Sequence, residues 1–223
     1  MPQRLPLFPL GLVLFPGLVL PLHVFEDRYR VLIRELLALP EAERLFGVVA
    51  IRQGREVGAD GVLALHEVGC TAQLRQADEH DDGRFDIVTT GTARFQLRGL
   101  AHDRPYLVGE VDLIDDELGS ADEADLLDRA VRVAYLDYLA ALVDAGADGM
   151  EMPELPPASL VLSYLVAATV VVDLDDRQAL LAQEDGVSRL RSELQLLRRE
   201  SRLLRALGAA PAPELTRTPI SHN

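Results

Sequence analysis

The histidines are the side chains whose chemistry would first suggest a metal site in this chain. They are His23, His66, His80, His102 and His222. No two of them form an H-x-x-x-H or H-E-x-x-H pair, which would place two imidazole ligands on one face of a helix. None lies in a local cluster with Cys70, the single cysteine. The spacing therefore predicts no metal site.

The acidic stretch DEHDDG at residues 78–83 has the composition of a calcium-binding loop. An EF-hand loop needs an oxygen ligand at its third position and a bidentate glutamate at its twelfth. These positions hold His80 and Thr89 here. Asp82-Gly83 is a strong two-residue hairpin signal, because both residue types tolerate positive φ. We expect a solvated hairpin tip rather than a calcium site.

The common catalytic motifs are missing. All 22 basic residues are arginines, which excludes a P-loop of the form G-x-x-x-x-G-K-S/T, a Ser–Lys dyad and a Schiff-base lysine. There is no G-x-S-x-G nucleophile elbow. The pair Asp115-Asp116 lies at an expected domain junction, and Cys70 is expected to be a small buried residue. The chain is therefore predicted to be non-enzymatic, with no catalytic residue and no cofactor.

The charge disfavours nucleic acid as a partner. The net charge is −14, with 19 acids against 12 arginines before Ser120 and 17 against 10 after it, so each part carries −7. Phosphate backbones repel such a protein unless a local patch overrides its field.

One local patch of positive charge lies near the C-terminus. It consists of Arg189, Arg191, Arg198, Arg199, Arg202 and Arg205, with only Glu193 and Glu200 between them. These arginines could complement a helix dipole and cover apolar surface with their stems. They could also form a docking stripe for an acidic partner or for nucleic acid.

The two most apolar runs do not predict a membrane segment. The first, residues 5–24, is interrupted by four prolines, and only Arg4 before it is basic, unlike a signal peptide. The second, residues 158–172, is shorter than the roughly 20 residues that cross a bilayer. With one cysteine, no internal disulfide can form. We expect a soluble, cytoplasmic protein.

Short strands separated by turns are expected over the first part of the chain. They cover residues 5–7, 18–24, 45–52, 62–65, 68–76, 85–90, 93–98 and 106–114. An early helix is indicated by apolar residues spaced three and four apart from Tyr29 to Leu37, and Pro40 ends it. Such strands favour a small closed or half-closed β-barrel, because closure removes exposed edges.

Helical spacing of leucine and alanine dominates the second part. Ser120 and Glu123 have the spacing of a capping box, and Gly146 ends the helix that they begin. Residues 158–171 are apolar on every side, which predicts a fully buried helix. A short helix over residues 175–183, capped by Asp175 or Asp176, precedes a long one over residues 187–208.

The predicted fold class is therefore α+β. A barrel subdomain is expected over residues 1–118, a bundle of about four helices over residues 119–208, and a disordered polar tail over residues 209–223. The loop of residues 9–17 has a longer apolar run than surface loops normally show. Either it folds back to plug the barrel, or it leaves an apolar patch that marks an interaction site.

Three stretches carry a resemblance to the N-terminal substrate-binding domain family of Lon protease. They are LPLFPLGLVLFPG at residues 5–17, LPLHVFEDRYR at residues 20–30 and VGCTAQLRQADEHDDGRFDIVTTGTARFQL at residues 68–97. The helical end, residues 178–204, is similar to the part that follows the barrel in the protease. The chain resembles the freestanding bacterial members, which lack the ATPase and peptidase domains.

The resemblance implies a PUA-like pseudo-barrel with one early helix, followed by the helical bundle. It also implies binding of unfolded or degron-bearing polypeptides, with a protease or chaperone as a further partner. Glu26, Arg28 and Tyr29 are expected to cap and orient the first helix. The peptide-binding candidates are Leu12, Leu14, Phe15 and Leu18. An RNA-binding protein is the alternative, because PUA-like barrels often bind RNA.

Overall fold

The computed structural model describes residues 3–54, 62–147, 153–207 and 221–222. The chain divides into two compact units, Met1–Asp115 with Ile220–Asn223 and Asp116–Pro219. Each unit is described by itself below. Within the described residues, no helix combines the length and the apolar character needed to cross a membrane.

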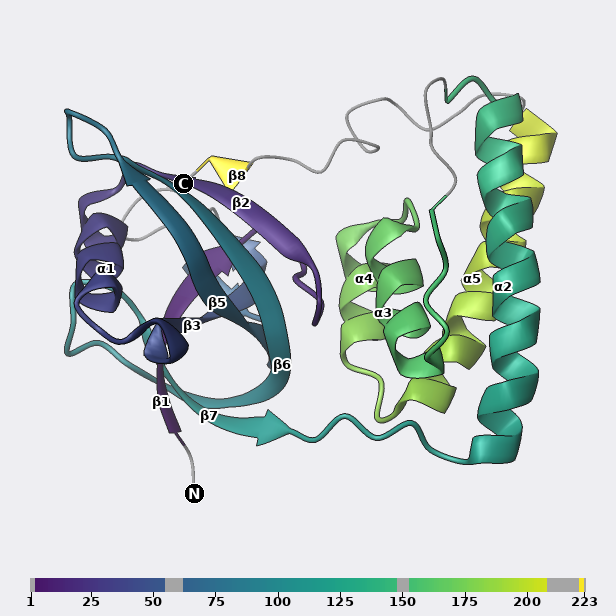
Figure 1. Ribbon diagram of the computed structural model, residues 1–223, viewed down its shortest axis with the longest axis horizontal. Coiled ribbons are helices and arrows are strands. Elements are labelled where there is room, and N and C mark those ends of the chain that lie inside the picture. Colours follow the sequence, from purple (N-terminus) through teal and green to yellow (C-terminus); the bar gives the residue numbers. More distant parts are fainter. Residues whose placement is uncertain (1–2, 55–61, 148–152, 208–220, 223) are drawn as a thin grey trace. The chain divides into compact units, whose positions relative to one another are not determined.

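The first unit contains strands β1 to β8, helix α1 and a short 3-10 helix at Glu41–Glu43. The elements are β1 (Gln3–Leu10), β2 (Val19–Val24), α1 (Asp27–Leu37), β3 (Leu45–Gly54), β4 (Val62–Leu65), β5 (Val68–Glu79), β6 (Phe85–Ala101), β7 (Val108–Ile114) and β8 (Ser221–His222). The pairings run from β1 through β3, β5, β6 and β7 back to β1, so these strands close on themselves (Figure 1). The predicted α+β class is confirmed.

Strand β1 tolerates its two interior prolines because it changes partner half-way. Its first four residues pair with β7, and its last four pair with β3. Pro6 and Pro9 each lie where the strand pairs on one side, so neither must donate to a second ladder. The predicted strand at residues 5–7 is thus part of one longer strand that runs to Leu10.

Strand β6 is one strand of 17 residues, where two were predicted. Its register against β5 shifts between Cys70 and Ala72 and between Leu74 and Gln76. Such bulges bend a strand and increase its twist. The bent strand, seen as a curved ribbon in Figure 1, pairs with β5 on one side and with β2 and then β7 on the other.

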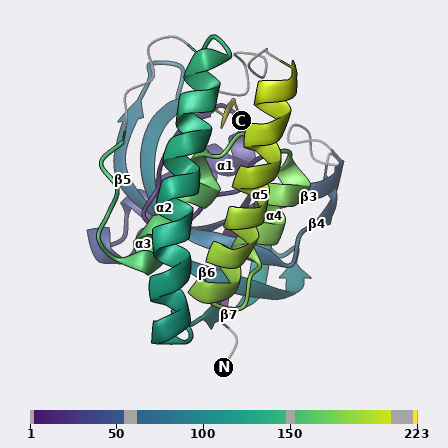
Figure 2. The ribbon, with the colours of Figure 1, turned by 90° about the vertical axis from the view of Figure 1, so that its right-hand side faces the viewer.

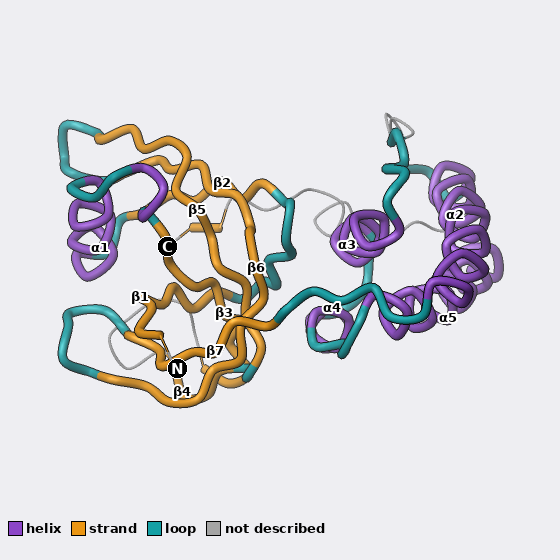
Figure 3. Tube along the Cα trace, turned by 60° about the horizontal axis from the view of Figure 1, so that its bottom comes forward, coloured by secondary structure: helices purple, strands orange, loops and turns teal. Residues whose placement is uncertain are grey.

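Helix α1 lies beside the strands of this unit (Figure 3), and its residues Tyr29, Leu32, Ile33 and Leu36 are buried in the core. Tyr29 is fully buried, and its ring stacks on Phe8 with centroids 4.1 Å apart. Glu26 occupies the N-cap position but makes no side-chain capping bond; its carboxylate lies 3.1 Å from Arg28 instead. The predicted orienting role thus holds for Tyr29, whereas Glu26 caps by position alone.

The second unit contains four helices in its described part. They are α2 (Ala121–Asp144), α3 (Ser159–Thr169), α4 (Leu174–Leu181) and α5 (Gly186–Leu207). Helices α2 and α5 lie side by side and run in the same direction (Figure 2). Ion pairs join them near both ends, Glu123 to Arg191 and Asp137 to Arg205.

The capping interactions of two helices differ from the predicted ones. Ser120 is the N-cap of α2, but its side chain makes no capping bond, so the predicted capping box does not form. The cap of α4 is Asp173 rather than Asp175 or Asp176, and it accepts from the amide of Asp176 at 2.8 Å. A capping side chain accepts a hydrogen bond from a free amide of the first turn, so it must belong to the residue just before that turn. In α4 this residue is Asp173, whereas Asp175 and Asp176 lie inside the helix.

Helix α3 is not buried on all sides as predicted, since Val161 is 53% exposed. The all-round apolar pattern cannot show which face stays uncovered. The predicted end of the last helix at Gly208 and most of the predicted tail lie outside the described residues.

Candidate functional site

The apolar loop between β1 and β2 is held to β6 by backbone hydrogen bonds. The amide of Gly17 donates to the carbonyl of Gly91 at 2.9 Å, and the amide of Gly91 donates to the carbonyl of Leu18 at 2.8 Å. A Cβ on Gly91 would lie 2.3 Å from the carbonyl oxygen of Phe15, so only glycine permits this approach. Gly17 has φ +82°, which also favours glycine. The loop therefore has a defined path across β6.

The structure separates the four predicted peptide-binding residues into two kinds. Leu14 is 4% exposed and Phe15 is 1% exposed, so both belong to the interior. Leu12 and Leu18 are half-buried and pack against the core from outside. The prediction that a peptide contacts Leu14 and Phe15 directly is therefore corrected, because both side chains are buried. The binding role of Leu12 and Leu18 stays a prediction.

Next to this loop, β2 is an edge of the sheet. On one side it pairs with β6 along its whole length, from Val19 opposite Thr90 to Val24 opposite Phe85. On the other side, it pairs only with β8, in parallel, at Leu22 and His23. Within the described part of the chain, residues 19–21 have no strand on that side. Val19, at the start of this edge, is 56% exposed.

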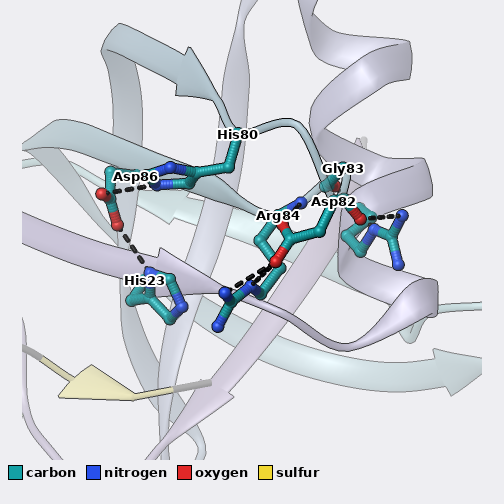
Figure 4. Close-up of polar contacts among 7 residues, drawn as sticks. His23, His80, Asp82, Gly83, Arg84 and Asp86 are labelled. Atoms are coloured by element: carbon teal, nitrogen blue, oxygen red, sulfur yellow. Dashed lines mark hydrogen bonds and ion pairs between the residues drawn. The ribbon is translucent and has the colours of Figure 1, made fainter.

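A second arrangement, which sequence spacing did not predict, joins His23, His80 and Asp86 (Figure 4). His23 Nδ1 lies 2.6 Å from one oxygen of Asp86, and His80 Nε2 lies 2.8 Å from the other. The two imidazole rings have centroids 6.0 Å apart. These hydrogen bonds hold the pKa of Asp86 below its usual value, because they favour the charged carboxylate.

Strand register explains why the motif search missed these three residues. His23 and Asp86 are direct partners in the antiparallel pair β2–β6, and partners in register share one face of a sheet. His80 arrives from the turn between β5 and β6, at the Asp82-Gly83 hairpin that the sequence predicted. The pairing of β2 with β6 could have indicated this cluster, but the spacing between histidines along the chain could not.

Half of the six arginines predicted to form a basic stripe already have an acidic partner. Arg191 and Arg205 bind acids on α2, and Arg199 binds Asp176 and Glu200. Arg198 and Arg202 are exposed and have no ion pair within the described residues. The stripe therefore offers far less uncompensated charge than the sequence suggested, which weakens the nucleic-acid alternative.

Arg189 lies in the interior of the second unit, not on a stripe. Its Nε donates to the carbonyl of Leu180 at 3.1 Å, its Nη1 donates to Ser163 Oγ at 3.1 Å, and it lies 4.1 Å from the ring centroid of Tyr164. Glu193, one turn later on α5, is also buried. Burial raises the pKa of Glu193 well above its usual value, and the charge of Arg189 opposes that rise. Cys70 is buried as predicted.

Comparison with known proteins decides the family. The sequence matches the family described as the ATP-dependent protease La (LON) substrate-binding domain over residues 4–199. The chain belongs to the Lon substrate-binding domain family. The predicted resemblance is thereby confirmed, and the match includes both the barrel and most of the helical unit of this Lon-family chain.

Relatives and solved structures of the Lon family agree with this membership. Lon protease 2 of Myxococcus xanthus is 29% identical over 206 residues, which are 92% of this chain and 24% of that protein. The Lon protease of Roseiflexus castenholzii is 31% identical over 219 residues, 97% of this chain and 26% of that protein. The chain thus spans about a quarter of the length of these curated relatives.

Two solved structures of Lon N-terminal domains share the fold of this chain. The Lon N-terminal domain protein from Xanthomonas campestris superposes with a TM-score of 0.61 and 26% identity, covering 88% of this chain and 98% of that chain. The N-terminal domain of the Mycobacterium avium complex Lon protease gives a TM-score of 0.58 with the same coverage. At 16% identity, the second comparison concerns the fold alone.

Proposed function

We propose that this chain is a non-enzymatic substrate-recognition module that binds extended, apolar polypeptide segments along the edge of β2. The observation that carries the proposal is this open edge at residues 19–21, next to the anchored apolar loop. The ligand class is an unfolded or degron-bearing polypeptide, and a protease or chaperone is the partner that would receive it.

The edge supports strand addition, in which an extended peptide hydrogen-bonds to exposed backbone groups of a sheet. The short strand β8 is an extended segment of this chain that already lies on β2 in parallel, beside Leu22 and His23. A bound peptide would pair with residues 19–21, the part of β2 that has no second strand partner within the described residues. Backbone pairing requires no particular side chains, which suits a module that recognises many unfolded chains.

Apolar contact adds to this pairing. Val19 is more than half exposed, Leu18 next to it in the sequence is half-buried, and so is Leu12 in the preceding loop. Removing such side chains from water contributes about 25 cal/mol per Å² of apolar surface and requires little sequence specificity. The burial of Leu14 and Phe15 keeps the loop in place rather than contributing contact surface.

The family also supports a role in substrate recognition, since its description names the substrate-binding domain of an ATP-dependent protease. Because this chain spans about a quarter of its curated relatives, their proteolytic activity is not transferred to it. Recognition without bond cleavage is the part of their activity that the matched domain supports.

The test is fluorescence anisotropy with labelled α-lactalbumin in two forms, native and permanently unfolded by reduction and carboxymethylation. We expect the unfolded form to bind and the native form not to bind. Val19→Asp should weaken binding at least tenfold, because losing one buried valine contact costs about 1.5–3 kcal/mol. Leu100→Asp is the matched control, since Leu100 is a similarly exposed apolar residue on β6.

Equal affinity for native and unfolded α-lactalbumin would contradict the proposal. Equal weakening by Val19→Asp and Leu100→Asp would show that general surface charge, rather than the β2 edge, controls binding. Both positions are exposed, so circular dichroism should show folded variants.

A further inference from the structure

His23, His80 and Asp86 bring three metal-ligating groups to one place on the barrel surface (Figure 4). One ligand atom from each residue lies within 4.8 Å of the others. The residues come from three places in the chain: β2, the β5–β6 turn and β6. Their convergence depends on the tertiary fold and not on a flexible acidic segment.

The three groups are held by a rigid frame. The turn is closed by the amide of His80, which donates to the carbonyl of Arg84 at 2.8 Å. Helix α1 supports it from the side, where Arg30 Nε donates to the carbonyl of Gly83 at 2.7 Å. Gly83 has φ +78°, and a Cβ there would lie 2.3 Å from Arg30 Nη2. The position of His80 relative to β2 and β6 is therefore preorganised, as a metal site requires.

We propose that His23 Nδ1, His80 Nε2 and a carboxylate oxygen of Asp86 form a binding site for a divalent transition-metal ion of the zinc class. Two imidazoles and one carboxylate are ligands that Zn²⁺, Co²⁺ and Ni²⁺ accept, whereas Ca²⁺ and Mg²⁺ prefer oxygen ligands only. Three protein ligands leave at least one coordination position for water or another ligand.

The side chains must rotate to bring one carboxylate oxygen and both nitrogens to the spacing that the ion requires. A tetrahedral Zn²⁺ with ligands about 2.0–2.1 Å away keeps the ligand atoms about 3.3 Å apart. Each imidazole nitrogen now faces a different oxygen of Asp86, at 2.6 and 2.8 Å, and the three ligand atoms lie within 4.8 Å of one another, so individual separations must change by up to about 1.5 Å to reach this spacing. His80 and Asp86 are about half exposed, which leaves their side chains free to rotate by that amount.

The surroundings favour a cation. Asp81 follows His80 in the sequence, and the whole chain carries a net charge of −14. Arg84 is the neighbouring cation on the turn, and Asp82 binds it at 2.6 Å. The arginine's charge is thus compensated locally, so it does not repel an ion at Asp86.

If a metal ion binds here, we expect the tautomers of His23 and His80 to change. A carboxylate can only accept hydrogen bonds, so the imidazole nitrogens that face Asp86 carry the protons when no ion is bound. Coordination requires a lone pair on these same nitrogens. The proton of a neutral His23 therefore moves from Nδ1 to Nε2, and that of a neutral His80 moves from Nε2 to Nδ1.

The experiment is isothermal titration calorimetry of tag-free protein with ZnCl₂ in a non-chelating buffer. We expect one molar equivalent to bind. Asp86→Asn and His80→Gln should each weaken binding at least tenfold, while His102→Gln, which removes an exposed histidine outside the cluster, should leave it unchanged. Imidazole ¹⁵N NMR should show the tautomer change on zinc addition, and Co²⁺ should give visible d–d absorption bands.

Absence of zinc binding by the wild-type protein would overturn the proposal, and the three residues would then form only a hydrogen-bonded bridge between strands. Zinc binding that survives in both Asp86→Asn and His80→Gln would also overturn it, because the ion would be elsewhere. His80 lies on an exposed turn, so its variant remains a valid test even if Asp86→Asn fails to fold. Polypeptide binding at residues 19–21 is measured separately, and its outcome does not affect this one.

Discussion

Glu193 should make the stability of the helical unit decrease as the pH rises. Its side chain is 1% exposed, and neither carboxyl oxygen has a hydrogen-bond partner in the described structure. Burial raises the pKa of this carboxyl well above its usual value of 4.5, even though the charge of Arg189 lowers it in part. An uncharged carboxylic acid is therefore the favoured form in the folded state.

The direction and size of the effect follow from proton linkage. Between pH 4.5 and the raised pKa, the folded state keeps a proton that the unfolded state has released. The free energy of unfolding therefore falls by about 1.4 kcal/mol per pH unit from this group, and the contribution of the neutral acid is lost as the pH rises through the folded pKa. Below pH 4.5 both states are protonated, and the contribution is complete.

The perturbation is Glu193→Gln, which keeps the shape and removes the titrating proton. Urea unfolding followed by helical circular dichroism, at pH values from 4 to 8, gives the free energy of unfolding for wild type and variant. We expect the variant to lose the falling slope and to be more stable than wild type at the upper end of this range. Glu184→Gln is the control, because Glu184 is an exposed glutamate in the same unit.

Parallel pH curves for wild type and Glu193→Gln would refute this reasoning. That result would mean that Glu193 is ionised in the folded protein and that Arg189 compensates its burial completely. A variant less stable than wild type at every pH would mean the same, since an amide cannot replace a paired carboxylate.

Two further predictions compare matched positions by thermal or urea unfolding. Gly91→Ala should destabilise the barrel by about 1–3 kcal/mol, because its Cβ would press on the carbonyl of Phe15, while Gly99→Ala, whose Cβ meets nothing closer than 3.5 Å, should have little effect. Asp173→Ala should cost about 1 kcal/mol by removing the cap of α4, whereas Ser120→Ala, which removes no capping bond, should be close to neutral. Equal effects within either pair would contradict the contacts described for it.

The sequence was a good guide to elements that local patterns specify. The amphipathic spacing that predicted the first helix matches α1, with Tyr29 and Leu36 buried on its inner face. The Asp82-Gly83 turn joins β5 to β6 as predicted, with Gly83 at positive φ. Both depend on residues that are near neighbours in the chain. The family, too, could be named from contiguous motifs within residues 4–199.

Several features that position the candidate site could not be predicted from neighbouring residues. The sequence predicted a strand over residues 5–7 only, but β1 runs from Gln3 to Leu10 and its two halves pair with different strands. Phe15 had the same apolar character as Leu12, and only packing shows that Phe15 is inside and Leu12 at the surface. Apolar residues in a loop carry no periodicity that would indicate which side is covered.

By itself, the sequence determined the α+β class, the early helix, the hairpin and the exclusion of lysine-dependent chemistry, because these follow from residue types and from spacings of a few residues. Tertiary structure alone decided which loop residues remain accessible, which arginines are already paired and how His23 meets Asp86 across 63 positions. The physical reason is register: contacts between distant segments depend on how strands align and bend, and that alignment is a property of the whole packed barrel.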